Sequence, residues 1–404
     1  MNKNQVKILA TVASALLVFF TTPSIAASHV NNHEGKQYED RILNIVNAVD
    51  KGELDLALSL SDELIEAFPD SRIGYLMKGD VLSAMAGDLT RFGQGVQSHK
   101  KARNNFSHEL KNRAHWRENE SEYNQKIPAS ILEMGSDKYV FVGEATTGRF
   151  FVFGNNNGQP YLVKDYYMTI GKEGYGKQVE GDNKTPLGLY SVTHEIDGKR
   201  LPDLYGSGAF PVDYPNKVDA WRKRTGYGIW LHGTPSDTYS RAPLASEGCF
   251  VLSNSDYEDV APYIREVGRP RVLLVETINW LTPEEHQKRK QDYLAVLQQW
   301  VAGWESLDIE QYLSFYDKEL FNFGKGNFSS WAERKRNITK NKKYIQLSLG
   351  LQSMYLYPGE ENMFTVDFKQ NYLSNNYQGT SDKTLYWKKS DDGKWKIIYE
   401  NVKS

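Results

Sequence analysis

The chain has 404 residues, with 49 basic and 51 acidic side chains and a formal net charge of only -2. This near-neutral balance argues against a nucleic-acid partner, and the length leaves room for two or three domains. A single cysteine, Cys249, excludes a disulfide framework within the chain.

The first thirty residues have the pattern of an export signal. Lys3 and Lys7 precede an apolar run over residues 8–20, which gives way to the small-residue segment TPSIAA. This order predicts a signal peptide over residues 1–27. The run is shorter than the roughly 20 apolar residues of a membrane-spanning helix. We therefore expect a mature periplasmic protein without a membrane span. In such an oxidising compartment a free thiol without a function would be exposed to oxidation.

Residues 38–126 are expected to be α-helical and then to form a connector. Ile42 and Ile45 belong to a run of apolar residues at helical spacing, and two further amphipathic stretches are separated at Pro69. This pair of stretches resembles a tetratricopeptide unit. A plain helical hairpin packed on the next domain accounts for the same pattern. Residues 90–126 are charged and weakly patterned, which indicates a connector.

Residues 131–277 change to short runs of alternating character broken by glycines. Such runs predict a mainly antiparallel β domain, a sandwich or a barrel. The glycine-rich stretch GKEGYGKQVEGDNKTPLGLY lies within it. It lacks the lysine-serine/threonine ending and the strand-to-helix context of a phosphate loop. Neither a nucleotide nor any other cofactor is predicted.

Residues 281–404 are expected to form an α+β domain. An amphipathic helix carries Leu297 and Trp300 on one face, and four strand-like runs follow, the last two joined by the hairpin signal Asp392-Gly393. This layout resembles the nuclear-transport-factor-2-like cone fold. Most of its aromatic residues are expected in the core. They include Trp331, Tyr355, Tyr357, Tyr372 and Trp387.

Cys249 lies in the segment GIWLHGTPSDTYSRAPLASEGCFVLSNSD, downstream of His232. His232 ends an apolar strand-like run, and the loop that follows is long enough to bring the cysteine beside it. A base or oriented N–H groups lower a thiol pKa and make it a nucleophile for acyl transfer. Gly233 and Gly248 allow close backbone approach. The N–H groups of Gly248 and Cys249 are candidate donors of an oxyanion hole. Spacing alone gives equal support to an alternative without catalysis, in which Cys249 is a small buried residue and His232 merely ends a strand.

The elements HGT and SEGC, followed by Asn254 and Asp256, resemble the signature of L,D-transpeptidases with a YkuD-type catalytic domain. The resemblance implies that Cys249 is the nucleophile, His232 the base, and the Gly233 carbonyl the group that orients the imidazole. It also implies that Ser246, Gly248 and the Cys249 N–H shape the oxyanion pocket. Two positions depart from the pattern. Glu247 stands where many members have histidine, and Val251 where many have arginine.

The resemblance implies a peptidoglycan tetrapeptide as substrate. Cys249 would attack at the L-centre of the third residue and expel D-alanine. An amine acceptor then gives a 3-3 crosslink, which we favour from sequence alone. Water instead makes the enzyme an L,D-carboxypeptidase, because domains of this order also resemble envelope enzymes that trim stems and influence cell shape.

Further candidates for substrate binding are surface-loop and cleft residues, since a guanidinium recognises carboxylates in bidentate fashion. They are Arg241, Tyr239, Tyr205, Glu247 and Asn254. An alternative of another class is a non-catalytic envelope scaffold that binds protein partners through the helical or C-terminal domain. A metal enzyme is weaker, because His232 and His194 lack the close spacing of zinc ligands. No metal is therefore predicted.

Overall fold

The structure is a computed structural model that describes residues 33–87, 100–321 and 327–403. The predicted signal peptide lies outside these residues. Within the described ranges, no helix is both long enough and apolar enough to cross a membrane.

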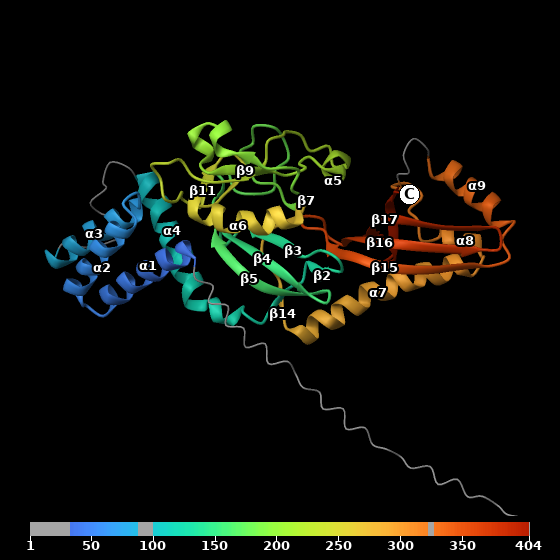
Figure 1. The fold of residues 1–404 in the computed structure, drawn as a ribbon, viewed down its shortest axis with the longest axis horizontal. Helices are drawn as coiled ribbons and strands as arrows, with labels where there is room; N and C mark the ends of the chain where they lie inside the picture. The colour runs from blue at the N-terminus through green and yellow to red at the C-terminus, as the bar shows by residue number, and fades with distance from the viewer. Residues whose placement is uncertain (1–32, 88–99, 322–326, 404) are drawn as a thin grey trace, which may run out of the picture. The chain divides into compact units, whose positions relative to one another are not determined.

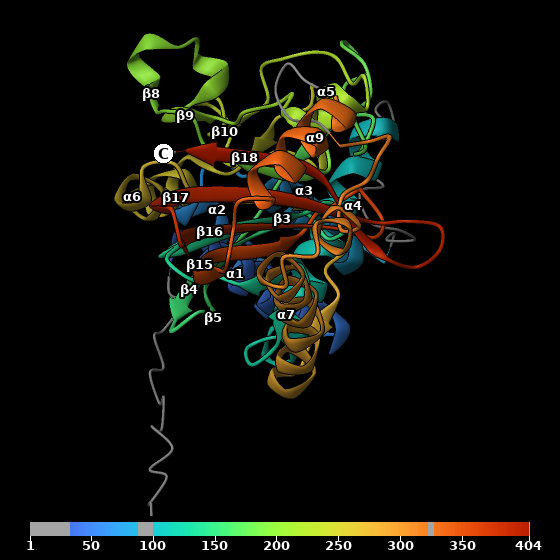
Figure 2. The ribbon, with the colours of Figure 1, turned by 90° about the vertical axis from the view of Figure 1, so that its right-hand side faces the viewer.

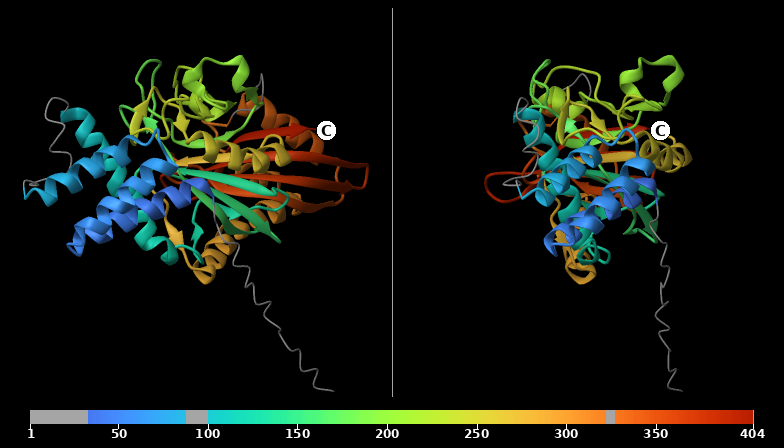
Figure 3. Two further views of the ribbon diagram at one scale, coloured as in Figure 1. Left: turned by 60° about the vertical axis from the view of Figure 1, so that its left-hand side comes forward. Right: turned by 90° about the vertical axis from the view of Figure 1, so that its left-hand side faces the viewer.

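The N-terminal region consists of helices (Figure 1). Three of them, α1 (Glu34–Asp50), α2 (Leu54–Ala67) and α3 (Arg72–Met85), lie side by side around one apolar cluster (Figure 3). The Ser71 hydroxyl accepts the Gly74 N–H and so caps α3 just after the predicted break. The segment predicted as a connector differs from that expectation, because much of it forms the helix α4 (Lys100–Asn119). Its signal is weak because its buried face mixes charged Glu109 and Arg113 with Trp116, so the apolar stripe is interrupted.

The central domain is built on a five-stranded sheet in the order β5-β4-β3-β13-β7, with only the β3–β13 pair parallel. Both faces of this sheet are buried. Phe150 and Val152 of β4 face one core, and Phe151 and Phe153 face the other. This is why the runs are almost continuously apolar. The strands are β3 (Tyr139–Glu144), β4 (Arg149–Asn156), β5 (Gln159–Tyr167), β7 (Gly188–Ser191) and β13 (Arg271–Val275).

A smaller sheet, in the order β12-β10-β9-β8, completes the central domain together with α5 (Lys217–Trp221) and α6 (Asn254–Val267). One core lies among this sheet, the five-stranded sheet and α6. The strands of the small sheet are β8 (Ile196–Asp197), β9 (Gly208–Pro211), β10 (Trp230–His232) and β12 (Phe250–Val251). A separate pair joins β6 (Ile170–Gly171) to β11 (Leu244–Ser246).

The C-terminal domain has helices followed by a sheet, as predicted. The sheet order is β18-β17-β16-β15-β2, and its four long strands stack side by side in Figure 2. Gly393, with φ of 80°, lies in the turn at the predicted hairpin between the last two strands. The elements are α7 (Pro283–Glu305), α8 (Ile309–Leu313), α9 (Phe328–Thr339), β15 (Ile345–Leu356), β16 (Met363–Ser374), β17 (Tyr377–Lys389) and β18 (Trp395–Lys403).

The aromatic residues of this domain are mostly in its cores. Trp331, Tyr355, Tyr357 and Trp387 are buried. Tyr372 is half-buried and lines a cavity of about 520 Å³ together with residues of α9, β16 and β17. The expectation of a core position therefore holds for four of the five.

The central and C-terminal domains share strands at their boundary. β2 (Ile131–Glu133) pairs with β15, so the predicted central segment 131–277 opens with a strand of the C-terminal sheet. β1 (Ile127–Pro128), just before β2 in the chain, pairs with β14 (Trp280–Leu281), which follows the central domain. The chain therefore enters and leaves the central domain through paired neighbouring strands.

Candidate active site

His232 ends strand β10, and Cys249 directly precedes the parallel neighbouring strand β12. In the β10–β12 pair, Leu231 is opposite Phe250, and His232 is opposite Val251. Leu231 and Phe250 are in the apolar core. Since successive side chains of a strand point to opposite faces, His232 and Cys249, which directly precedes Phe250, both point away from that core. The two sequence candidates are thus delivered to the same face of the small sheet.

His232 is held in one tautomer by the backbone. Its Nδ1 lies 2.7 Å from the Gly233 carbonyl oxygen. Because a carbonyl only accepts, Nδ1 carries the proton and Nε2 keeps its lone pair free for a thiol proton. Burial lowers the pKa of His232 to about 4, although the hydrogen bond to Gly233 opposes this. The imidazole is therefore a neutral base at physiological pH.

Asn254 fixes the Gly233 carbonyl from behind. Its Oδ1 accepts the N–H groups of Ser207 at 2.9 Å and of Thr234 at 3.2 Å, and its Nδ2 donates to the Thr234 carbonyl at 2.8 Å. A Cβ on Gly233 would lie 2.2 Å from Asn254 Oδ1, so only glycine fits there. Asn254 was predicted to bind substrate. In the structure the Asn254 amide instead hydrogen bonds to backbone groups of Ser207 and Thr234. Asn254 therefore positions the residue that follows Gly233.

Cys249 is half-buried, and its thiol donates to the Gly228 carbonyl with a 3.4 Å separation. Burial raises the pKa of this thiol to about 11, while a backbone hydrogen bond from Trp230 and the charge of Arg241 act in the lowering direction. A lowered pKa was expected for this thiol. In the resting site burial raises it, so the sulfur is protonated at neutral pH, and acting as a nucleophile would require loss of that proton to a base.

Hydrogen bonds on both sides fix the Gly248–Cys249 peptide. Thr185 Oγ1 donates to the Gly248 carbonyl at 2.9 Å, and the Gly248 N–H donates to Ser246 Oγ at 3.1 Å. Ser246 Oγ in turn donates to the Cys249 carbonyl at 2.6 Å. The Gly248 N–H, predicted as an oxyanion donor, is therefore already engaged. The Cys249 N–H points opposite to the Gly248 carbonyl across the planar peptide and remains the candidate donor.

Thr185 was not among the predicted site residues, although it contacts the Gly248 carbonyl. It is buried, and its hydroxyl accepts the Gly171 N–H at 3.0 Å while donating to Gly248. It opens the segment TPLGLY, which lies far from Cys249 in the chain. Only the fold brings the two together, so spacing carried no signal for this contact.

Two of the further candidates lie at the site. The Tyr205 ring stands edge-on to His232, with ring centroids 5.0 Å apart. Arg241 is close enough to act electrostatically on both His232 and Cys249. Its carbonyl accepts hydrogen bonds from Tyr167 and Thr169, which hold that part of the loop.

Of the other two, Tyr239 lies away from the site and Glu247 lies at its exposed edge. Tyr239 packs against Tyr38 and Phe68 of the helical region, tilted to the first ring and edge-on to the second, with centroids 4.4 and 4.8 Å away, so its predicted place in the cleft is wrong. It anchors the loop between His232 and Cys249 to the helices. Glu247 is exposed and lies 3.3 Å from Lys172. It precedes Gly248, and its charge acts against ionisation of Cys249.

A family model of the L,D-transpeptidase catalytic domain matches residues 137–274, and a model of the Cds6 C-terminal NTF2-like domain matches residues 292–401. The structure of Bd1075 from Bdellovibrio bacteriovorus is similar at 32% identity and a TM-score of 0.60, covering 69% of this chain and 98% of that one. This chain belongs to the L,D-transpeptidase family with a YkuD-type catalytic domain.

A second member of similar architecture is the helical cell shape determining protein Pgp2 from Campylobacter jejuni. It matches at 29% identity and a TM-score of 0.55, covering 70% of this chain and 97% of that one. A search of curated proteins finds no match. The similarity to both structures spans nearly their whole length, so the catalytic domain and the NTF2-like domain are matched together.

The raised thiol pKa gives a testable pH dependence. We expect alkylation of the protein by iodoacetamide to be slow at pH 7 and to rise about tenfold per pH unit toward pH 10, because only the thiolate reacts. Mass spectrometry of the intact protein measures this directly, since Cys249 is the only cysteine. A rate that stays flat between pH 6 and pH 9 would instead indicate a preformed thiolate–imidazolium pair.

Proposed function

We propose that this chain is a periplasmic L,D-carboxypeptidase that trims peptidoglycan tetrapeptide stems to tripeptides and thereby influences cell shape. The observation that carries the chemistry is the placement of His232 and Cys249 on one face of adjacent strands, with the imidazole neutral and its Nε2 free. The cell-shape role of Pgp2, which has the same domain pair, favours trimming over crosslinking.

The proposed reaction has two halves. His232 Nε2 takes the thiol proton as Cys249 Sγ bonds to the carbonyl carbon at the L-centre of the third stem residue. The Cys249 N–H stabilises the oxyanion. When the intermediate collapses, the carbon–nitrogen bond to D-alanine breaks, and His232 returns its proton to the leaving amine. Water, deprotonated by His232, then cleaves the thioester and restores the thiol.

Arg241 fits this proposal as a substrate contact. A tetrapeptide ends in the carboxylate of D-alanine, and Arg241 provides a guanidinium that donates to the Ala245 carbonyl and whose charge acts on Cys249. At Val251, where many family members have arginine, this chain has none. The proposed role is that the loop residue supplies the positive charge from another point of the chain.

A second candidate function is transpeptidation, which is favoured by the match to the L,D-transpeptidase catalytic-domain family. The two differ only in what cleaves the thioester. An amine of another stem gives a 3-3 crosslink, whereas water gives a tripeptide. The first half-reaction and its residues are common to both.

The test is to incubate the mature protein with disaccharide-tetrapeptide in water enriched in ¹⁸O and to analyse the products by mass spectrometry. We expect disaccharide-tripeptide with one ¹⁸O in its new carboxylate, plus free D-alanine, and none of these with Cys249→Ala. A crosslinked dimer lacking one D-alanine and carrying no ¹⁸O would favour the transpeptidase. If the folded protein leaves the substrate unchanged, the result would favour the alternative of a non-catalytic envelope scaffold.

A further inference from the structure

The segment 222–228 joins α5 to the strand that carries His232. Its last residue, Gly228, provides the carbonyl that accepts the Cys249 thiol, and it adopts φ of 73°, which favours glycine. Ile229 alone separates it from β10. Any contact that fixes this segment therefore also fixes the resting position of the sulfur and the approach to the catalytic strand.

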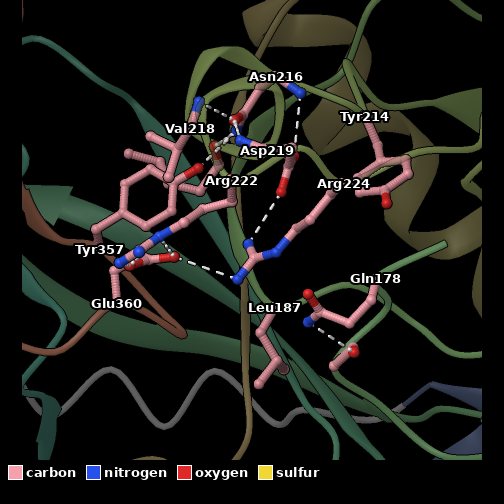
Figure 4. A network of polar contacts seen from close by, with 12 residues as sticks. Gln178, Leu187, Tyr214, Asn216, Val218, Asp219, Arg222, Arg224, Tyr357 and Glu360 are labelled. Carbon is pink, nitrogen blue, oxygen red and sulfur yellow. Dashed lines mark hydrogen bonds and ion pairs between the residues drawn. The ribbon is translucent and has the colours of Figure 1, made fainter.

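The C-terminal domain holds the beginning of this segment through Glu360, in the turn between β15 and β16 (Figure 4). Arg222 Nε donates to both carboxylate oxygens of Glu360 at 2.9 Å, and Arg224 Nη2 donates to Oε1 at 3.2 Å. The Glu360 side chain is only 4% exposed. A buried carboxylate held by two guanidinium groups is a rigid connection.

Buried groups on the catalytic side complete this connection. Arg224 Nη1 donates to Asp219 at 3.1 Å, and Asp219 closes a capping box with Asn216 at the start of α5. Asn216 Nδ2 also donates to the hydroxyl of Tyr357 at 2.7 Å, a second contact with the C-terminal domain (Figure 4). Glu360, Arg224 and Asp219 are thus linked by hydrogen bonds across the two domains, and Asn216 and Tyr357 add a second link.

The next residue, Thr225, extends the connection to the glycine-rich loop. Its N–H donates to the Gln178 carbonyl at 3.0 Å, and its hydroxyl accepts the Glu180 N–H at 3.1 Å. In the same loop, Lys177 donates to Asp182 at 2.8 Å and lies close enough to Cys249 for its charge to favour the thiolate. The contacts that begin at Glu360 therefore end on two sides of the cysteine.

We propose that Glu360 of the C-terminal domain is a positioning residue for the catalytic cysteine, acting through Arg222, Arg224 and the segment 222–228. It touches neither substrate nor the reacting atoms. This inference rests on the proposed function for its turnover readout, although the reactivity of the thiol reports on it independently of any substrate.

The test compares Glu360→Gln with wild-type protein. The amide keeps the shape but removes the charge and half of the acceptor capacity. We expect kcat/KM for tetrapeptide trimming to fall by about 10- to 100-fold, mainly in kcat, because small displacements of a nucleophile are costly. The rate of Cys249 alkylation and its pH midpoint should change as well. Arg222→Lys, which keeps the charge but loses the fork, should give a smaller change in the same direction.

A matched control removes another carboxylate between the same domains. Asp367 of β16 pairs with Arg271 of β13 at 2.9 Å, away from the segment 222–228. Asp367→Asn should lower the melting temperature comparably but leave kcat/KM and alkylation within about twofold of wild type. Folded Glu360→Gln with unchanged alkylation and turnover would overturn the inference, as would an equal loss in Asp367→Asn. If wild type turns over no substrate, the proposed function fails, while the alkylation comparison still decides the role of Glu360.

Discussion

Replacing Cys249 by alanine should lower the rate of D-alanine release by about 10³-fold or more. The sulfur is the only nucleophile that the proposed reaction provides, and removal of a nucleophile from a coupled pair eliminates nearly all of its rate enhancement. The measurement is D-alanine release from purified disaccharide-tetrapeptide. Because Cys249 is small and half-buried, we expect the melting temperature to change little.

The proposed proton transfer from Cys249 to His232 also predicts how the single and double variants of these residues compare. His232→Ala should lose a comparable factor, and the double variant should be no slower than the slower single variant, since groups that act as a unit are not additive. If the two losses instead multiplied, the residues would be acting independently, and a direct proton transfer between them would be excluded.

Arg149→Met should lower the free energy of unfolding by about 3–5 kcal/mol, the range measured when one partner of a buried ion pair is removed. Arg149 is fully enclosed and pairs with Glu39 of α1 at 2.6 Å and with Asp165 of β5. Both carboxylates are themselves buried. Methionine fills similar space but leaves them without this cation. Urea unfolding followed by tryptophan fluorescence measures the loss.

An exposed ion pair provides the matched control. Arg336 and Glu310 of the C-terminal domain pair at 2.7 Å on the surface, where solvent screens the interaction. Arg336→Met should leave the urea midpoint within experimental error of wild type. A midpoint for Arg149→Met equal to that of the control would show that the buried charges are relieved by water or by rearrangement.

The domain layout was predictable because each region has its own periodicity. The helices α1 to α3 of the N-terminal region and the four long strands of the C-terminal sheet stand where their apolar spacing places them. The helix α4 was missed because it buries Arg113, which donates to Glu109 and Glu39. A helix that faces a core partly through paired charges has an interrupted apolar stripe, so the hydrophobic pattern does not detect it.

For the site, the sequence predicted two candidate reactive residues but not the hydrogen bonds around them. The resemblance singled out Cys249 and His232, and both face the same side of the small sheet. Whether the Gly248 N–H is free, or whether Asn254 faces substrate, depends on partners such as Ser246 and Thr234 that only the fold brings near. Tyr239 was misplaced for the same reason, since its neighbours come from helices that lie far away in the chain.

The pairing of β2 with β15 affects whether the catalytic domain and the C-terminal domain can be separated. The short strand precedes the catalytic domain in the chain, yet it covers the edge of the C-terminal sheet, where His286 Nε2 also contacts the Ile131 carbonyl at 2.7 Å. A C-terminal fragment that starts after the catalytic domain would expose an unpaired edge, which invites aggregation. Gene rearrangements that carry the C-terminal domain alone would leave behind one of its strands, so the two domains are expected to be inherited as a single module.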